Sequence, residues 1–256
     1  MNDPQRGLFS FDDIKFTLFE SCSRPRWRSP QRGALGALMA HWSLPRGTPA
    51  LISLPTGSGK SAVALAAPFL ASAQRVLMVV PSTDLRRQLA GAFTDLALLQ
   101  HIDAVDQGCA PRVHELVHRV QDWQDIEQYE VVVASPSTIS PVHYPESPPP
   151  ENLFDLVVID EAHHSSAPTW RAILEHFTAA KALLLTATPR RLDGQRLPGE
   201  HIYHYPLRQA LEERIFKPVE PVLLSGPWTA RVDTDRALVA KTVDRRFPRP
   251  THQFTD

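Results

Sequence analysis

Short runs of apolar residues alternate with longer segments of helical periodicity along this chain of 256 residues. The apolar runs predict strands at 51–54, 75–80, 131–134, 154–159 and 181–185. Helical spacing predicts helices at 60–72 and 169–177, and a third helix, N-capped by Ser82 or Thr83, with Leu85, Leu89, Phe93, Leu96 and Leu99 on one face. Continuous apolar strands separated by helices are typical of a parallel sheet. The pattern therefore predicts an α/β fold with a mainly parallel sheet and helices on both faces.

The prolines divide the chain. There are 24 of them, more than the usual ~5% of residues. One cluster, over 136–150, predicts an irregular surface insertion, and another, from Pro218 to Pro250, lies in a segment of weak periodicity. We therefore expect an N-terminal extension over 1–24, one α/β domain over 25–215, and a linker or the truncated start of a second domain over 216–256.

Charge and cysteine content narrow the class of protein. Lys and Arg number 27 against 28 Asp and Glu, so bulk positive charge does not drive binding to nucleic acid, although a local basic groove is compatible with it. Only Cys22 and Cys109 occur, without zinc or disulfide spacing, which suits a reducing compartment. The first residues lack a signal pattern, and no apolar run reaches the ~18 residues of a membrane span. A cytoplasmic protein without membrane contact is expected.

The segment Leu54–Ser61 predicts a phosphate site. Its LPTGSGKS sequence follows a strand and opens a helix, so backbone N–H groups of the glycine loop and the helix N-terminus would face an anion. Lys60 would reach the β- and γ-phosphates and Ser61 would bind Mg²⁺. Leu54 stands where the full loop pattern has its first glycine, and a glycine-rich turn with a surface lysine is the alternative.

A second strand ends in the sequence DEAHH. One carboxylate, Asp160, can hold Mg²⁺, and the next, Glu161, can act as general base toward an attacking water. A solvated strand end is the alternative for this segment taken alone. His163 and His164 have no Cys or third His at ligand spacing, so a zinc site is not expected.

A third strand ends in Thr186 and Thr188, followed by Pro189 and two arginines. Hydroxyl groups at the carboxyl end of a strand lie near the ligand crevice of an open α/β sheet. An ordinary exit from the strand into a turn is the alternative.

In this order and spacing, GSGKS, DEAH and TAT resemble motifs I, II and III of superfamily 2 helicases and translocases. Residues 80–88 resemble motif Ia and residues 134–139 motif Ib of the same superfamily. DEAHH and LTATPRRLDG are most similar to the motor subunits of type I and type III restriction enzymes, and the resemblance covers roughly residues 25 to 220. It implies a RecA-like P-loop NTPase domain.

The resemblance also implies a site. ATP and Mg²⁺ are the implied cofactors; the loop residues Thr56, Gly57, Ser58, Gly59, Lys60 and Ser61 would hold the nucleotide, and Ser61 and Asp160 the metal. Lys60, Asp160, Glu161 and His163 are the implied catalytic residues, with His163, Thr186 and Thr188 coupling nucleotide to nucleic acid. Gln31 would read adenine, although Pro30 stands where relatives place an aromatic residue, and Gln31 as an ordinary residue of a helix start is the alternative.

Nucleic-acid contacts are expected at the helix N-termini that follow two strands. The implied residues are Ser82, Thr83, Arg86, Ser135 and Thr138, with DNA favoured over RNA. A solvated face is the alternative for each arginine.

The implied function is the N-terminal ATP-binding half of an ATP-dependent nucleic-acid helicase or translocase, in restriction or phage defence. The late arginine motif of such motors has no match here, so a second RecA-like domain is expected from a further C-terminal part or a partner subunit, and hydrolysis by this half alone is expected to be weak. The alternative function is a nucleotide- or nucleic-acid-binding adaptor derived from a helicase.

Overall fold

The computed structural model describes residues 8–14, 26–44, 47–106, 110–162, 168–188 and 197–216. All of them belong to one compact unit, Met1–Lys217. The predicted extension over 1–24 and tail over 216–256 fall largely outside the described residues, so the predicted domain limits stay predictions.

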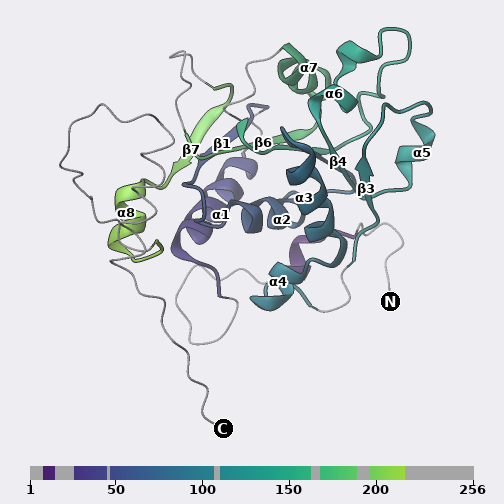
Figure 1. Ribbon diagram of the computed structural model, residues 1–256. Helices are drawn as coiled ribbons and strands as arrows, with labels where there is room; N and C mark the ends of the chain where they lie inside the picture. Colours follow the sequence, from purple (N-terminus) through teal and green to yellow (C-terminus); the bar gives the residue numbers. More distant parts are fainter. Residues whose placement is uncertain are drawn as a thin grey trace, which may run out of the picture. The chain divides into compact units, whose positions relative to one another are not determined.

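Seven strands form one sheet within these residues, and every pair of neighbours is parallel (Figure 1). The order across the sheet is β3-β4-β2-β5-β6-β1-β7. The strands are β1 (Ala50–Ser53), β2 (Val76–Val79), β3 (Val113–Leu116), β4 (Val131–Ala134), β5 (Leu156–Ile159), β6 (Lys181–Thr186) and β7 (Glu200–His204). The predicted fold class, an α/β domain of RecA type with a parallel sheet, is confirmed.

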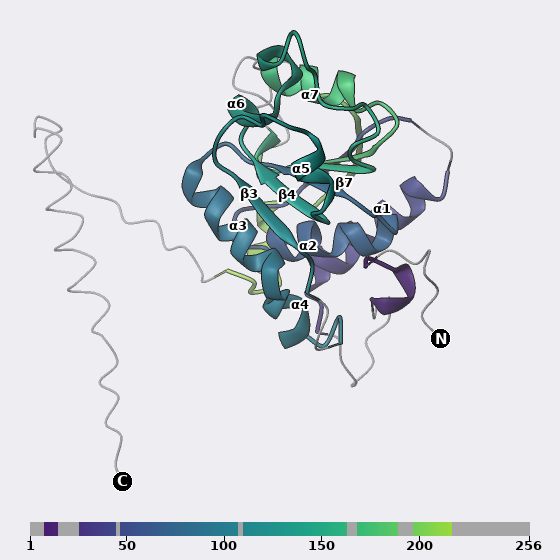
Figure 2. The same cartoon turned by 90° about the vertical axis from the view of Figure 1, so that its right-hand side faces the viewer.

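Helices cover both faces of the sheet (Figures 1 and 2). One face carries η1 (Phe11–Asp13), α1 (Ser29–Trp42), α2 (Lys60–Ala71), α3 (Thr83–Asp95) and α4 (Ala97–His101). The other carries α5 (Gln124–Glu127), α6 (Pro136–Ile139), η2 (Pro141–His143) and α7 (Pro168–His176). The chain then continues through β7 into α8 (Leu207–Glu212). Among the described helices, none combines the length and the apolar character that crossing a bilayer requires.

Adjacent strand residues contribute to two different cores. Ile52, Met78 and Val158 are buried against α1, α2 and α3, whereas their neighbours Leu77 and Val157 are buried against the other layer. Because successive side chains of a strand point to opposite faces, a strand covered on both faces is apolar throughout. This arrangement explains the continuous apolar runs in the sequence.

The structure corrects the predicted elements in two places. The single helix predicted from Ser82 to Leu99 is two helices, because Leu96 takes a positive φ of 51° and ends α3. The insertion predicted as irregular contains α6 and η2 and buries Tyr144.

Several elements were not predicted, namely β3, β7, α1, α5, α8 and the short η1. The edge strands β3 and β7 carry His and Glu residues in place of an apolar run, because each has a neighbour strand on one side only. Helix α1 has few charged residues and a weak apolar stripe, yet it buries Ala34, Leu35 and Leu38.

Candidate active site

The turn from β1 into α2 leaves the helix N-terminus open. Gly57 and Gly59 take φ angles of 85° and 99°, and α2 begins at Lys60 with Gly59 as its N-cap and no capping side chain. Thr56 and Ser61 are exposed on this loop. A left-handed backbone is open to glycine at little cost, and an uncapped helix N-terminus attracts anions. The predicted phosphate loop is therefore folded as a turn with two left-handed glycines that leads into a helix N-terminus without a capping side chain.

Ser58 has a different orientation from its neighbours in the loop. Its side chain is fully buried, and its Oγ donates a hydrogen bond to the Pro55 carbonyl oxygen over 2.6 Å. This contact closes the turn from the inside. Ser58 thus shapes the loop through its side chain.

Gln31 and Arg28 support the loop from the start of α1. The Gln31 Oε1 accepts from the Arg28 backbone N–H over 2.9 Å, and its Nε2 donates to the Gly59 carbonyl oxygen over 3.4 Å. The Arg28 Nη1 donates to the Gly57 carbonyl oxygen over 3.3 Å. A Cβ atom on Gly59 would lie 2.1 Å from the end of the Gln31 side chain, and the φ of 99° strains any other residue, so this position favours glycine. Gln31 therefore lies against the predicted nucleotide loop, and the adenine contact stays a prediction.

The charged residues of the first two motifs meet at the carboxyl edge of the sheet. The Lys60 Nζ donates to the Glu161 Oε1 over 2.7 Å, although 100 residues and more separate them along the chain. Lys60 is 8% exposed. β6 separates β1 from β5 in the sheet, and this ion pair joins the segments that follow those two strands. The pair assembles the predicted catalytic lysine and the predicted general base in one place.

Asp160 lies beside this pair. Burial raises the pKa of its carboxyl group, the Lys60 ammonium opposes that rise, and the charge of Glu161 adds to it. The Asp160 Oδ1 accepts the Glu161 backbone N–H over 2.9 Å, and Glu161 itself takes a positive φ of 52°. A left-handed backbone at a residue other than glycine is locally strained, and such strain is common at functional sites.

The third motif lies between the other two. β6 separates β1 from β5, and its last residue, Thr186, is fully buried. The Thr186 carbonyl oxygen accepts from the Leu54 N–H over 2.9 Å, and its Oγ1 accepts from the Thr188 N–H over 3.1 Å. Thr186 thus joins the phosphate loop to the turn that carries Thr188, which is compatible with the predicted coupling role.

The two predicted nucleic-acid motifs differ in what their side chains contact. Ser82 caps α3, with its Oγ accepting from the Leu85 N–H over 3.3 Å, and Thr83 is exposed beside it. Arg86 is only 6% exposed, and its Nε donates to the Glu115 Oε1 over 3.1 Å. Arg86 therefore joins α3 to β3, whereas Arg87 is exposed.

The second of these motifs caps α6. The Ser135 N–H donates to the Thr138 Oγ1 over 3.1 Å, and the Ser135 Oγ lies 2.8 Å from the Ser137 Oγ. Thr138 is 8% exposed, and its carbonyl oxygen accepts from the Tyr144 hydroxyl. Ser135 lies at the surface end of this motif and Thr138 beneath it.

His163, His164, Pro189, Arg190 and Arg191 lie outside the described residues, so their predicted roles stay predictions. Across the described residues, no group of three or more His, Cys, Asp or Glu side chains could hold a metal ion. Two contacts were missed in the sequence: Arg28 on Gly57, and Phe216, whose ring lies 3.0 Å from a Cβ built on Gly57. No local pattern links Phe216 to a loop about 160 residues earlier.

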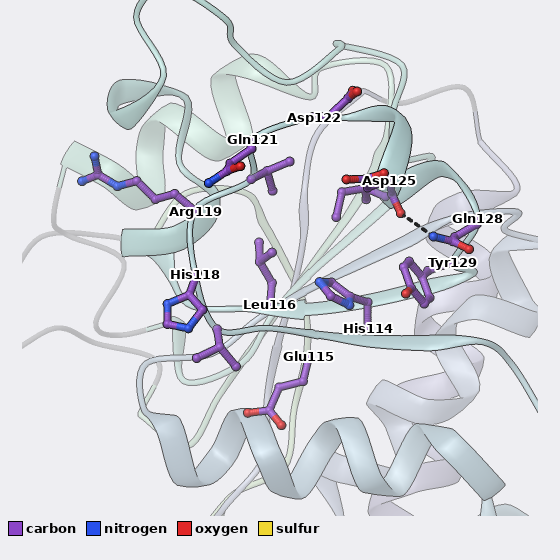
Figure 3. Close-up of a pocket in the computed structure, with 13 residues that line it drawn as sticks. His114, Glu115, Leu116, His118, Arg119, Gln121, Asp122, Asp125, Gln128 and Tyr129 are labelled. Carbon is purple, nitrogen blue, oxygen red and sulfur yellow. Dashed lines mark hydrogen bonds between the residues drawn. The ribbon is translucent and has the colours of Figure 1, made fainter.

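A cavity of about 650 Å³ lies at the opposite, β3 edge of the sheet (Figure 3). His114 of β3 and Tyr129 after α5 stack in it with ring centroids 4.7 Å apart, and burial lowers the pKa of His114. Glu115 points away from this stack toward α3, where it pairs with Arg86. None of the predicted site residues lines the cavity.

Comparison with known proteins agrees with the geometry. The family model "Type III restriction enzyme, res subunit" matches residues 24–191, which is more than half of the chain. The chain belongs to this family. It therefore carries the helicase-type motor domain of type I and type III restriction enzymes. The family predicted from the sequence motifs is confirmed.

Individual relatives share parts of the chain. A type I restriction enzyme EcoAI endonuclease subunit from Escherichia coli is 35% identical over 111 residues, which are 41% of this chain and 12% of that protein. The putative ATP-dependent helicase IRC3 of Saccharomyces cerevisiae is 34% identical over 100 residues, 35% of this chain and 14% of that protein. The chain thus matches about an eighth of the length of these relatives.

One solved structure has a similar fold. A nuclease-deletion mutant of the type ISP restriction-modification enzyme LlaGI, solved with a DNA substrate mimic, matches 88% of this chain and 23% of its own with a TM-score of 0.52. The sequence identity is 17%, so the likeness is one of fold.

The described residues fit the cofactors that the family implies. Gly57 and Gly59 have left-handed backbones, Thr56 and Ser61 are exposed, and the buried Lys60 ammonium lies beside Glu161 and Asp160. Backbone N–H groups and a lysine suit the phosphates of ATP, and a serine hydroxyl with a carboxylate suits Mg²⁺, which prefers oxygen ligands. At the level of the family, the chain is of the ATP-using helicase type.

Proposed function

We propose that this chain is the ATP-binding part of an ATP-dependent motor that acts on nucleic acid, with DNA favoured over RNA. The observation that carries the proposal is the distance of 2.7 Å between the Lys60 Nζ and the Glu161 Oε1 at the mouth of an uncapped, glycine-lined helix N-terminus. A cation, a general base and an anion cradle in contact are the parts that phosphoryl transfer to water needs.

Each residue then has a defined task. Lys60 leaves Glu161 to neutralise the β- and γ-phosphates, because a phosphate oxygen is a stronger partner for an ammonium than a partly exposed carboxylate. Glu161, released from the ion pair, accepts the proton of the attacking water. Ser61 and Asp160 would hold Mg²⁺, which would neutralise charge on the phosphates. The Lys60 ammonium opposes the rise in the pKa of Asp160, so loss of that lysine favours the protonated form of the Asp160 carboxyl.

The family relation and the hydroxyls of Ser82, which is exposed, and Ser135, which is half-buried, support nucleic acid as the partner. Both follow strands whose carboxyl ends lie on the same edge of the sheet as the ATP site. A second RecA-like domain, from a further part of the protein or from a partner subunit, would supply the arginine that neutralises charge in the transition state. The adaptor alternative is disfavoured, because an adaptor has no use for Glu161 as a water-activating base.

Two variants separate binding from hydrolysis. Glu161→Gln keeps its size, loses its basicity and is expected to bind ATP while hydrolysing at least about a hundredfold more slowly. Lys60→Ala is expected to lose both activities, and Lys181→Ala, at the far end of β6, serves as the control. Calorimetry with ATP and Mg²⁺ measures binding, and phosphate release measures hydrolysis.

The wild-type chain alone is expected to bind ATP and to hydrolyse it slowly. Absence of ATP binding by the folded chain would contradict the proposed function. Brisk DNA-stimulated hydrolysis by the chain alone would contradict only the need for a second motor domain. Binding of labelled duplex DNA and RNA, each competed with salt, tests the partner.

A further inference from the structure

Phe216 lies against the phosphate loop from the far end of the domain. Its ring carbon Cε1 is 3.0 Å from the position of a Cβ on Gly57, and the ring is partly buried against the core that includes α1 and α2. No other aromatic side chain is among the nearest atoms to the glycines of this loop in the described residues. The contact joins residues about 160 positions apart.

The local backbone holds Phe216 in that place. Helix α8 ends in a turn in which Arg214 takes a φ of 56° and the Ile215 N–H donates to the Ala210 carbonyl oxygen over 2.9 Å. The Ser29 Oγ at the start of α1 donates to the Glu213 Oε2 over 2.5 Å. The first contact closes the turn after α8, and the second holds Glu213 against the same α1 segment that supports the loop through Arg28 and Gln31.

The sheet order gives the direction in which a nucleotide would lie. The terminal phosphate belongs near Lys60 and Glu161, which lie between β1 and β5. The rest of the molecule must then extend away from β5, toward β7 and α8, which follow β1 at the other side of the sheet (Figure 1). Phe216 and Arg28 lie against Gly57 on that side.

We propose that Phe216 is a base-binding residue of this site, whose ring stacks on the base of a bound nucleoside triphosphate. The inference rests on the proposed function. Gln31 uses both ends of its carboxamide to hold Arg28 and Gly59, so base recognition on this side depends on an aromatic face. Stacking of a base on an aromatic side chain tolerates different bases and contributes to affinity without hydrogen bonds.

The test compares a ligand that has a base with one that lacks it. Wild-type chain, Phe216→Leu and Phe216→Trp are titrated with ATP and with inorganic tripolyphosphate, both with Mg²⁺, by calorimetry. Phe216→Leu keeps apolar bulk against Gly57 and loses the aromatic face, so its Kd for ATP is expected to rise about tenfold while that for tripolyphosphate stays within about twofold. Phe216→Trp is expected to retain the wild-type affinity for ATP.

A second measurement does not depend on the leucine variant folding. The tryptophan introduced at position 216 is expected to change its fluorescence when ATP is added and not when tripolyphosphate is added, relative to the wild-type chain. Equal weakening of both ligands in Phe216→Leu, or no weakening of either, would overturn the inference and leave the proposed function intact. If the wild-type chain binds neither ligand, the proposed function itself fails.

Discussion

Three turns at the same edge of the sheet lead from a strand into a helix, and they treat the helix N-terminus differently. At α3 and α6 the first turn is capped by the chain itself, through Ser82 on Leu85 and through Ser135 with Thr138. At α2 the cap is Gly59, without a side chain. The four free N–H groups of a helix start need partners, so the uncapped turn is the one that is open to a ligand.

The candidate site also differs from the cavity at the β3 edge of the sheet. The cavity at the β3 edge has volume and an aromatic stack, yet its nearest charged pair, Arg86 with Glu115, is a contact between elements. At the loop that follows β1, the charges of Lys60 and Glu161 converge, and Glu161 has a left-handed backbone. Convergence of charge on an open helix end identifies this site better than cavity volume does. The following variants test this comparison.

The largest effect is expected from two glycine substitutions of the same kind. Gly59→Ala places a Cβ 2.1 Å from the Gln31 Nε2 at a φ of 99°, so we expect at least a hundredfold loss of ATP affinity and about 1–3 kcal/mol of lost stability. Gly91→Ala in α3 meets nothing within 4 Å and is expected to stabilise the chain by about 0.5–1 kcal/mol. ATP titration and thermal unfolding measure both. A Gly59→Ala chain that binds ATP normally would show that the loop needs no open backbone.

The next effect distinguishes two adjacent arginines. Arg86→Ala leaves the Glu115 carboxylate partly buried without its partner, and we expect about 2–3 kcal/mol of lost stability in urea unfolding. Arg87→Ala removes an exposed cation, so stability is expected to change by less than about 0.5 kcal/mol while the salt dependence of DNA binding decreases. If Arg86→Ala kept its stability and lost DNA binding while Arg87→Ala bound DNA normally, Arg86 would instead be the contact to the nucleic-acid backbone.

A smaller effect, of opposite sign, is expected at Asp160. The pKa of its carboxyl is raised in the folded chain, so the folded state keeps its proton to higher pH than the unfolded state, and stability falls as pH rises through that interval. Asp160→Asn is therefore expected to be more stable at pH 7 by on the order of 1 kcal/mol, or ~2–4 °C in Tm, and to have lost Mg²⁺-dependent hydrolysis. The difference in stability between Asp160→Asn and the wild-type chain should disappear below about pH 4. A gap that is constant with pH would show that burial of the charge is not its cause.

The smallest effect is expected at the capped turn of α3. Ser82→Ala removes an N-cap and is expected to cost about 0.5–1 kcal/mol of stability without changing ATP affinity. Ser82→Asp keeps the cap and adds a negative charge where nucleic acid is expected, so its stability should match the wild type while DNA affinity decreases. Equal DNA binding by all three chains would remove Ser82 from the predicted nucleic-acid track.

The sequence predicted the centre of the fold better than its edges. The apolar strands β1, β2, β4, β5 and β6 have covered faces on both sides and therefore a continuous pattern. The edge strands β3 and β7 show no such run, because half of their surroundings is solvent. The break at Leu96 was missed because a single left-handed residue leaves the apolar spacing unchanged.

The sequence motifs identified the residues of the candidate site, but only the fold shows which of these residues lie close together. Lys60 and Glu161 were predicted from their local sequences, whereas their direct ion pair depends on β6 lying between β1 and β5. Arg86 was predicted as a nucleic-acid contact with a solvated face as the alternative, and its pair with Glu115 was missed, since periodicity does not tell a paired buried arginine from an exposed one. Phe216 gave no signal, because its partner Gly57 is distant in sequence.

The position of β1 in the sheet has a consequence for biosynthesis. Its two neighbours are β6 and β7, so Ala50 pairs with Leu183 on one side and with Glu200 on the other. At ordinary rates of translation, about ten seconds pass between the emergence of the strand and that of its partners. Pairings between such distant segments form late in folding. The loop that would hold the triphosphate therefore becomes complete only when the last strands have joined, so the proposed ATP site would be a property of the finished domain and not of the nascent chain.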